Sequence, residues 1–131
     1  MRKYSIENYP KDVEKCFSFL INECGFQLKE FKERQFSYLH VYEKDEIRIE
    51  LNFDIMDNFF YYSVISGKDT AYNDLNKENI TSFYEIAEKT TSCVDLNGLQ
   101  PNDEQYLIAL SSNAEILKAY FKMGAYDKVK V

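Results

Sequence analysis

Hydrophobic and polar residues alternate strictly from Glu46 to Asp54, in the sequence EIRIELNFD. The apolar residues Ile47, Ile49, Leu51 and Phe53 take every second position, and charged or amide residues lie between them. Side chains of a β-strand point alternately to its two faces, so this period of two is typical of a strand with one buried and one wet face. We therefore predict a strand over residues 46–54, at the centre of an antiparallel sheet.

Three further segments have the composition of strands. Residues 59–65, FFYYSVI, are dense in aromatic and β-branched side chains, which favour strands. Residues 26–33 and 35–43 precede the central strand, with Lys44-Asp45 as the centre of the turn that leads into it. The four segments predict a meander in which each strand pairs with the next.

The register of the hairpin between residues 35–43 and 46–54 has two alternatives. If Tyr42 lies opposite Ile47, then His40 lies opposite Ile49 and Phe36 opposite Phe53, all on the core side. A three-residue loop instead turns Leu39 and Val41 inward and His40 outward, because a slip of one residue swaps the two faces of a strand. Cross-strand aromatic pairing favours the first register, and the sequence leaves both open.

Apolar residues at spacings of three and four predict helices at both ends of the chain. The first helix is predicted over residues 10–24, with Pro10 in its first turn and Gly25 as its end. Its apolar stripe consists of Val13, Cys16, Phe17, Leu20, Ile21 and Cys24.

The second predicted helix follows Asn79, which we expect to cap it; its apolar residues are Ile80, Phe83, Tyr84 and Ala87. The last helical region is predicted over 103–123, either as one helix or as two that break at residues 111–113. Its stripe consists of Leu107, Leu110, Ala114, Leu117 and Phe121, and Gly124 ends it. Residues 68–77 and 95–102 are predicted loops.

The order of these elements predicts an α+β fold: a four-stranded antiparallel meander packed against an N-terminal helix and two or three C-terminal helices. A chain of 131 residues is expected to form a single domain, 1–131. Hydrophobic residues make up 45% of it, with ten Phe and eleven Tyr, which argues against disorder.

The net charge is −6, and residues 43–57 hold six acidic residues against two basic ones. An acidic chain disfavours nucleic acid and anionic membranes, which attract basic surfaces. We weigh two readings of the acidity, simple solubility and a basic protein partner. No apolar run reaches 18 residues and no signal peptide is evident, so we expect a cytoplasmic protein without a membrane span.

The chemistry of the remaining residue types gives no catalytic or cofactor motif. Cys16, Cys24 and Cys93 form no CxxC pair, and on one helix Cys16 and Cys24 lie about 12 Å apart, too far for a disulfide. We expect three free thiols. The single histidine, His40, lacks a nucleophile motif, zinc ligands are missing, and the four glycines form no phosphate loop. We therefore expect no cofactor, no metal and no enzyme activity.

Carboxylates and tyrosines are the remaining candidates for binding. Glu46, Glu50 and Asp54 share one face of the predicted strand, and Asp57 lies in the next turn. Glu46 and Glu50 would lie about 13 Å apart, farther than the carboxylate pair of a glycosidase. Asp54 and Asp57 lack the further ligands of an EF-hand. A solvated strand face is the simplest interpretation.

The aromatic run over residues 59–62 must direct two of its four rings away from the core. Either a helix covers these rings, or they form an exposed patch beside the acidic strand face. In the second case Tyr61 or Tyr62, whichever faces outward, would join the acidic residues in a protein-binding surface, with rings for contact area and charge for steering.

A helix that ends in Cys24-Gly25-Phe26, followed by a meander with Tyr42-Glu43 and Ile47-Arg48-Ile49, resembles small acidic bacterial immunity proteins of polymorphic toxin systems. The resemblance covers the first half of the chain. It implies a cytoplasmic single domain that binds and blocks a toxin. The alternatives are a small-ligand-binding domain with an aromatic pocket between sheet and helices and, third, an enzyme that uses carboxylates.

Overall fold

A computed structural model of the chain describes residues 8–57, 59–67, 79–90 and 106–122. Its strands are β1 (Gln27–Glu33), β2 (Ser37–Lys44), β3 (Ile47–Asp54), β4 (Phe59–Ser66) and β5 (Ile80–Ser82). Its helices are α1 (Tyr9–Cys16), α2 (Phe19–Asn22), α3 (Phe83–Thr90) and α4 (Tyr106–Lys122). The predicted loops at 68–77 and 95–102, and the helix end predicted at Gly124, lie outside the described residues.

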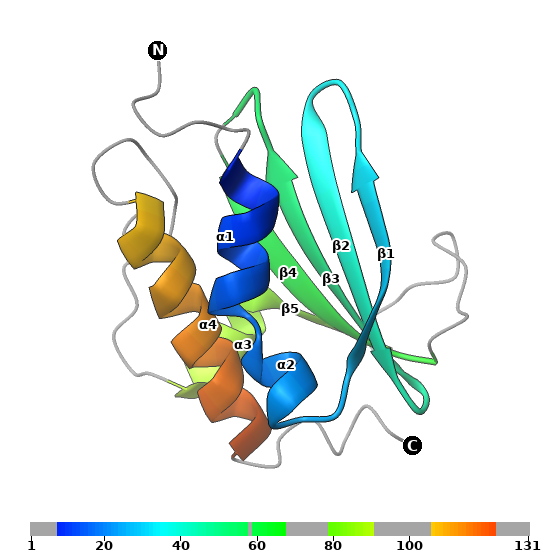
Figure 1. The fold of residues 1–131 in the computed structure, drawn as a ribbon. Coiled ribbons are helices and arrows are strands. Elements are labelled where there is room, and N and C mark those ends of the chain that lie inside the picture. The colour runs from blue at the N-terminus through cyan, green and yellow to red at the C-terminus, as the bar shows by residue number, and fades with distance from the viewer. Residues whose placement is uncertain (1–7, 58, 68–78, 91–105, 123–131) are drawn as a thin grey trace.

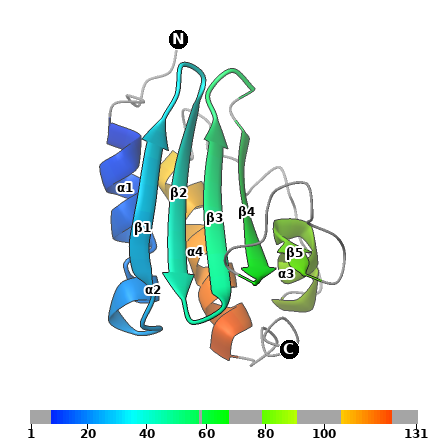
Figure 2. The ribbon, with the colours of Figure 1, turned by 90° about the vertical axis from the view of Figure 1, so that its right-hand side faces the viewer.

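The strands form one antiparallel sheet in the order β1-β2-β3-β4-β5, with β3 at its centre. Helices α1, α2 and α4 lie on one face of the sheet, and α3 lies beside its β5 edge (Figures 1 and 2). The α+β class and the meander of the first four strands are confirmed. The prediction of four strands is wrong, because Ile80–Ser82 pairs with β4 as a fifth.

This fifth strand moves the start of the following helix. We predicted a helix from Asn79 onward, but α3 begins at Phe83, and the Ser82 side-chain oxygen accepts a hydrogen bond from the Glu85 N–H at 3.4 Å. Ile80 lies opposite Ile65 on β4, so pairing with the edge of the sheet overrides the helical periodicity at this point. Tyr84, predicted in the apolar stripe, is 45% exposed.

In the β2–β3 hairpin Tyr42 and His40 face the core, as in the first predicted register, but their partners on β3 differ from the predicted ones. Tyr42 lies opposite Ile49 and His40 opposite Leu51, two residues away from the predicted partners Ile47 and Ile49. Phe53 lies opposite Tyr38, and Phe36, predicted on the core side, is exposed. The turn consists of Asp45 and Glu46, and Asp45 has a φ of 53°, as two-residue hairpin turns require. A shift of two residues conserves the faces, which is why His40 still points to the core.

The predicted N-terminal helix is two shorter helices. Its continuation stops at Phe17, whose N–H still donates to the Val13 carbonyl, and α2 starts two residues later. The break turns Phe17, Phe19 and Leu20 into the core. Ile21, which a continuous helix would bury, is 46% exposed.

The other helix ends agree better with the sequence. Gly25 has a φ of 81°, in the left-handed region that glycine adopts without strain, and it ends this helical region as predicted. The C-terminal region is a single helix, α4, which runs through residues 111–113. The buried Asn113 side chain donates to the Ala109 carbonyl at 2.9 Å, so the polar residue is bonded within its own helix. Leu107, predicted in the stripe of this helix, is exposed.

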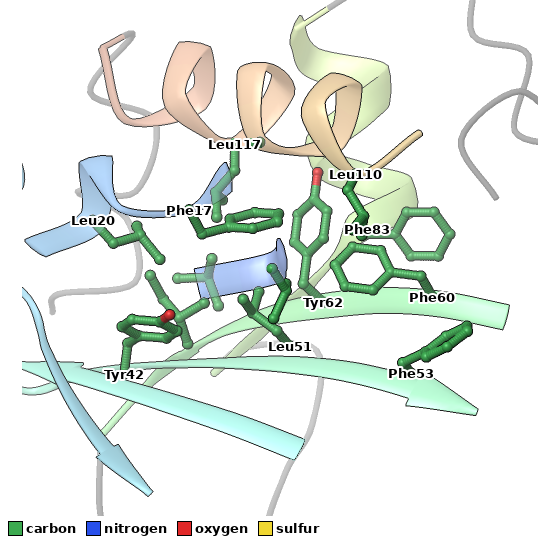
Figure 3. Packing of buried hydrophobic residues seen from close by; sticks show 14 of the residues in the cluster. Phe17, Leu20, Tyr42, Leu51, Phe53, Phe60, Tyr62, Phe83, Leu110 and Leu117 are labelled. Atoms are coloured by element: carbon green, nitrogen blue, oxygen red, sulfur yellow. The ribbon is translucent and has the colours of Figure 1, made fainter. Parts of the chain in front are cut away.

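The core lies between the sheet and the helices. From β3 it includes Ile49, Leu51 and Phe53, and α4 covers them with Leu110 and Leu117. Figure 3 shows the aromatic part of this layer, which consists of Phe17, Tyr42, Phe53, Phe60, Tyr62 and Phe83. Within the described residues, no helix is long and apolar enough to span a membrane.

Candidate functional site

The face of the sheet opposite the helices carries three of the residues singled out from the sequence, Glu50, Asp54 and Tyr61. We call this face, formed by the side chains of β2, β3 and β4 that point away from the helices, the open face (Figure 2). Because the core residues of β3 point to the helices, Arg48, Glu50, Asn52 and Asp54 point the other way. The open face therefore has polar residues along its central strand.

The six acidic residues of 43–57 do not form one patch. Glu46 lies in the β2–β3 turn and not in the predicted strand, whereas Asp54 is the last residue of β3. Eight strand residues separate the two turns, so the acidic groups at the two ends lie roughly 25 Å apart. A cluster in the sequence is thus divided between opposite ends of the sheet.

Glu50, in the middle of this row, is paired with a base. Its carboxylate lies 3.0 Å from the Arg48 Nε, and the side chains are only 17% and 12% exposed. The Arg48 guanidinium offsets the charge of Glu50 locally, so this carboxylate projects little field toward a distant partner.

Asp54 and Asp57 come together at the β3–β4 turn. The backbone N–H of Asp57 donates to the Asp54 side-chain oxygen at 3.2 Å, an Asx-type bond that holds the turn. Asp54 lies opposite Phe59 on β4, so its carboxylate lies beside an aromatic residue.

Tyr61 and Tyr62 have opposite environments. The Tyr62 side chain is fully buried in the core (Figure 3), and burial raises the pKa of its hydroxyl. Tyr61 is half-buried on the open face, opposite Asn52, and its ring lies 5.7 Å from that of Phe59. Of the two tyrosines, Tyr61 is the one that faces outward.

These contacts define a small surface, the aromatic–acidic corner, made of Asp54, Asp57, Phe59 and Tyr61. The sequence indicated three of its four residues. Phe59 was missed as a site residue, although the β3–β4 register, once the turn is known, places it beside Asp54. Two adjacent rings with carboxylates at their border can bind an apolar group that carries a positive charge.

His40 forms a second polar site, on the helix side of the sheet. Its side chain is fully buried, and Nε2 lies 2.9 Å from the Glu14 carboxylate of α1. The Phe31 ring lies 4.6 Å away and the Tyr9 ring 6.1 Å away. Burial lowers the pKa of His40, and the hydrogen bond with Glu14 opposes that effect. This pair ties α1 to β2.

A cavity of about 340 Å³ opens at the end of the molecule where α2, the β2–β3 hairpin and α4 meet. Phe26 and Phe121, with ring centroids 5.6 Å apart, form part of its wall. Lys44, which donates to the Cys24 carbonyl at 2.7 Å, lies at its border. The other lining residues are Glu23, Cys24, Asp45, Ile47, Lys118 and Lys122. Three separate segments build it, so no single stretch of sequence indicated it.

The remaining chemical groups are dispersed. Cys16 and Cys24 are free thiols, and Cys93 lies outside the described residues. In the part of the chain that the structure describes, no three histidine, cysteine or acidic side chains gather as metal ligands.

Comparisons with known proteins find no relative: no family model, no curated protein and no solved structure matches the chain.

Proposed function

We propose that this protein is a non-enzymatic binding protein of the immunity or inhibitor type, which engages a basic protein partner through the aromatic–acidic corner. The observation that carries the proposal is the pair of half-buried rings, Phe59 and Tyr61, with centroids 5.7 Å apart; Phe59 also packs against Phe83 of α3, with centroids 6.0 Å apart. Aromatic residues that keep part of their surface open to solvent are typical anchors of protein interfaces.

The charges support a division of roles within this surface. Asp54 and Asp57 lie at the same turn, and their fields add along one direction. A basic partner would be attracted by these carboxylates and held by contact with the rings. The proposal differs from a surface based on the whole acidic stretch, because Glu46 lies at the far turn and Glu50 is paired with Arg48.

Binding kinetics with a candidate partner test the proposal. The candidates to take first are the basic proteins encoded beside this gene, since immunity proteins bind such products. Tyr61→Ala should raise the dissociation rate about tenfold or more, as loss of an anchor does. Tyr84→Ala is the matched control, because Tyr84 is also exposed but lies on α3. Equal effects of the two substitutions, or none, would contradict the assignment.

Salt dependence tests the electrostatic part. Fields between exposed charges are screened within about 8 Å at physiological salt, so the association rate should fall as salt rises. The double substitution Asp54→Asn and Asp57→Asn should reduce both the association rate and its dependence on salt. Glu50→Lys should mainly disrupt the local ion pair with Arg48 and should change the association rate less. If the association rate does not change with salt concentration, the electrostatic part of the proposal is wrong and the acidic residues serve solubility alone.

A second candidate function is small-ligand binding in the cavity between α2, the β2–β3 hairpin and α4. Its volume lies within the usual range for ligand sites, and its combination of phenyl rings with lysines fits an aromatic carboxylate. Titration of the protein with aromatic monocarboxylates, followed by NMR shifts, tests this function. Shifts confined to residues around Phe26 and Phe121 that disappear in Lys122→Ala would support it, and an unchanged spectrum would exclude this ligand class.

A further inference from the structure

The outer edge of the sheet at β1 is open in the part of the chain that the structure describes. β1 pairs with β2 on one side, and no described strand pairs with its other side. All seven residues of β1 are exposed, and Figure 2 shows the strand at the border of the sheet. Edge strands of this length offer unpaired N–H and C=O groups to another strand.

The hydrogen bonding of β1 identifies the residues whose backbone points outward. The Arg34 N–H donates to the Ser37 carbonyl at 2.8 Å, so these two residues form a hydrogen-bonded pair at the β1–β2 turn. Hydrogen-bonded and non-bonded pairs alternate along an antiparallel ladder. Phe31, opposite His40, is therefore in a non-bonded pair, and its N–H and C=O point away from β2.

The sequence of β1 is complementary to itself when two copies run antiparallel. With Phe31 opposite Phe31 of a second chain, Glu30 of each copy lies opposite Lys32 of the other; Lys29 lies in the bulge of β1, outside this regular pairing. The segment EFK thus places an acid opposite a base at two positions across such a pair. A register shifted by one residue would instead place Glu30 opposite Glu33, with like charges together.

Apolar surface accompanies this edge. Leu28 and Phe31 point to the helix side of the sheet, since they lie opposite the core-facing Tyr42 and His40, yet they are 36% and 39% exposed. The Phe31 ring already stacks on Tyr38 with centroids 6.0 Å apart. A second β1 beside it would cover the exposed side of this ring with another phenyl group.

We propose that the β1 edge is a self-association surface, at which two copies of this chain pair antiparallel about a two-fold axis at Phe31 and join their sheets. The two Phe31 residues exchange backbone hydrogen bonds, and the Glu30–Lys32 pairs form on the open-face side. Lysines and the bulge between Leu28 and Glu30 protect an edge against foreign strands. In this register the charges of a second copy match those of the first.

Charge reversal at single positions tests the register. Glu30 and Lys32 are about half exposed, and their contact with each other is 3.4 Å within one chain, so their replacement leaves the core untouched. Glu30→Lys places two lysines opposite each other in the dimer, and Lys32→Glu places two glutamates opposite each other. Each variant alone should dimerise roughly tenfold more weakly than the wild type, because like charges directly opposite destabilise a strand pair.

An equimolar mixture of the two variants should recover dimerisation, because the lysines at positions 30 and 32 of one chain then face the glutamates at positions 32 and 30 of the other. Glu88→Lys and Lys89→Glu, exposed on α3, are the controls with the same changes of net charge. Sedimentation equilibrium over about a hundredfold range of micromolar concentrations gives the dissociation constants, and thermal melting verifies that each variant folds.

Three results would overturn the proposal: a wild type that stays monomeric throughout, single variants that dimerise as the wild type does, or a mixture no better than its components. If either single variant fails to fold, Glu30→Gln and Lys32→Gln test the same contact without charge reversal, and each should weaken dimerisation relative to the wild type. The corner around Tyr61 lies on β3 and β4, so this result is independent of the proposed partner binding.

Discussion

Tyr61 and Tyr62 are neighbours in the chain, but their side chains lie on opposite faces of β4. Tyr62 is fully buried among Phe17, Phe60 and Phe83, whereas Tyr61 lies on the open face. Tyr62→Ala should lower the free energy of unfolding by about 3–5 kcal/mol, as expected when a large core side chain is removed. Tyr61→Ala should cost roughly 1 kcal/mol or less. Urea titration of both variants measures the difference, and equal losses would mean that the faces of β4 are assigned wrongly.

His40 should titrate below its ordinary pKa of 6.5, because burial disfavours the imidazolium. The unfolded chain then binds the proton more readily than the folded one. The contribution of neutral His40 to stability is therefore fully present above the unfolded pKa and is lost as the pH falls from there through the lower folded pKa. NMR of the single histidine gives the value directly.

The Glu14 carboxylate opposes this shift, because it accepts a hydrogen bond from the ring. Glu14→Gln should accordingly lower the pKa of His40 further, and Glu23→Gln, at a distant acidic residue of the same helical region, should leave it unchanged. A histidine pKa above 6.5 in the wild type would contradict the buried environment.

At the scale of elements, β3 is the strand on which the sheet depends. Its odd-numbered residues are buried and its even-numbered ones half-buried along its whole length. Leu51→Asp should lower the free energy of unfolding by about 3 kcal/mol or more, since a carboxylate in the core must be desolvated or protonated. Asn52→Asp places the same group on the open face and should change stability by less than about 1 kcal/mol. A Leu51→Asp variant that melts near the wild-type temperature would refute the central position of β3.

The elements that differ from prediction do so where tertiary contacts compete with local periodicity. Ile80 has the spacing of a helix residue, but the free edge of β4 offers backbone hydrogen bonds there, and a strand forms. At Phe17 the apolar stripe continues along the sequence, yet the helix breaks, and both Phe17 and Leu20 are buried. Periodicity shows which residues are apolar. It does not show where contacts with a neighbouring strand or helix override the local preference for one type of secondary structure.

At the scale of the whole molecule, Cys16 and Cys24 are free thiols on the helical side. With Cys93, the denatured protein should yield three titratable thiols in the absence of reductant. Cys16 lies 3.7 Å from the Ser111 hydroxyl and Cys24 lines the cavity beside Lys44. Neither of these two thiols is therefore bonded to another cysteine. A count of one would indicate an intramolecular disulfide and an oxidising compartment, contrary to our expectation of a cytoplasmic protein.

The sequence alone determined the α+β class, four of the five strands, the inward face of β3 and the end of the first helical region at Gly25. Each of these rests on a local rule: a period of two, a period near three and a half, or the conformational freedom of glycine. The inward direction of His40 followed from one of two registers, and only the two-residue turn at Asp45 and Glu46 decided between them.

The site depended on tertiary structure for a different reason. The acidic residues that lie close together in the sequence are spread by a strand over both ends and the middle of the sheet, since an extended chain advances about 3.4 Å per residue. Asp54, Phe59 and Tyr61 are brought together only by the pairing of β3 with β4. The Arg48 pair that offsets Glu50, and the cavity formed by three distant segments, likewise depend on contacts that no local pattern contains.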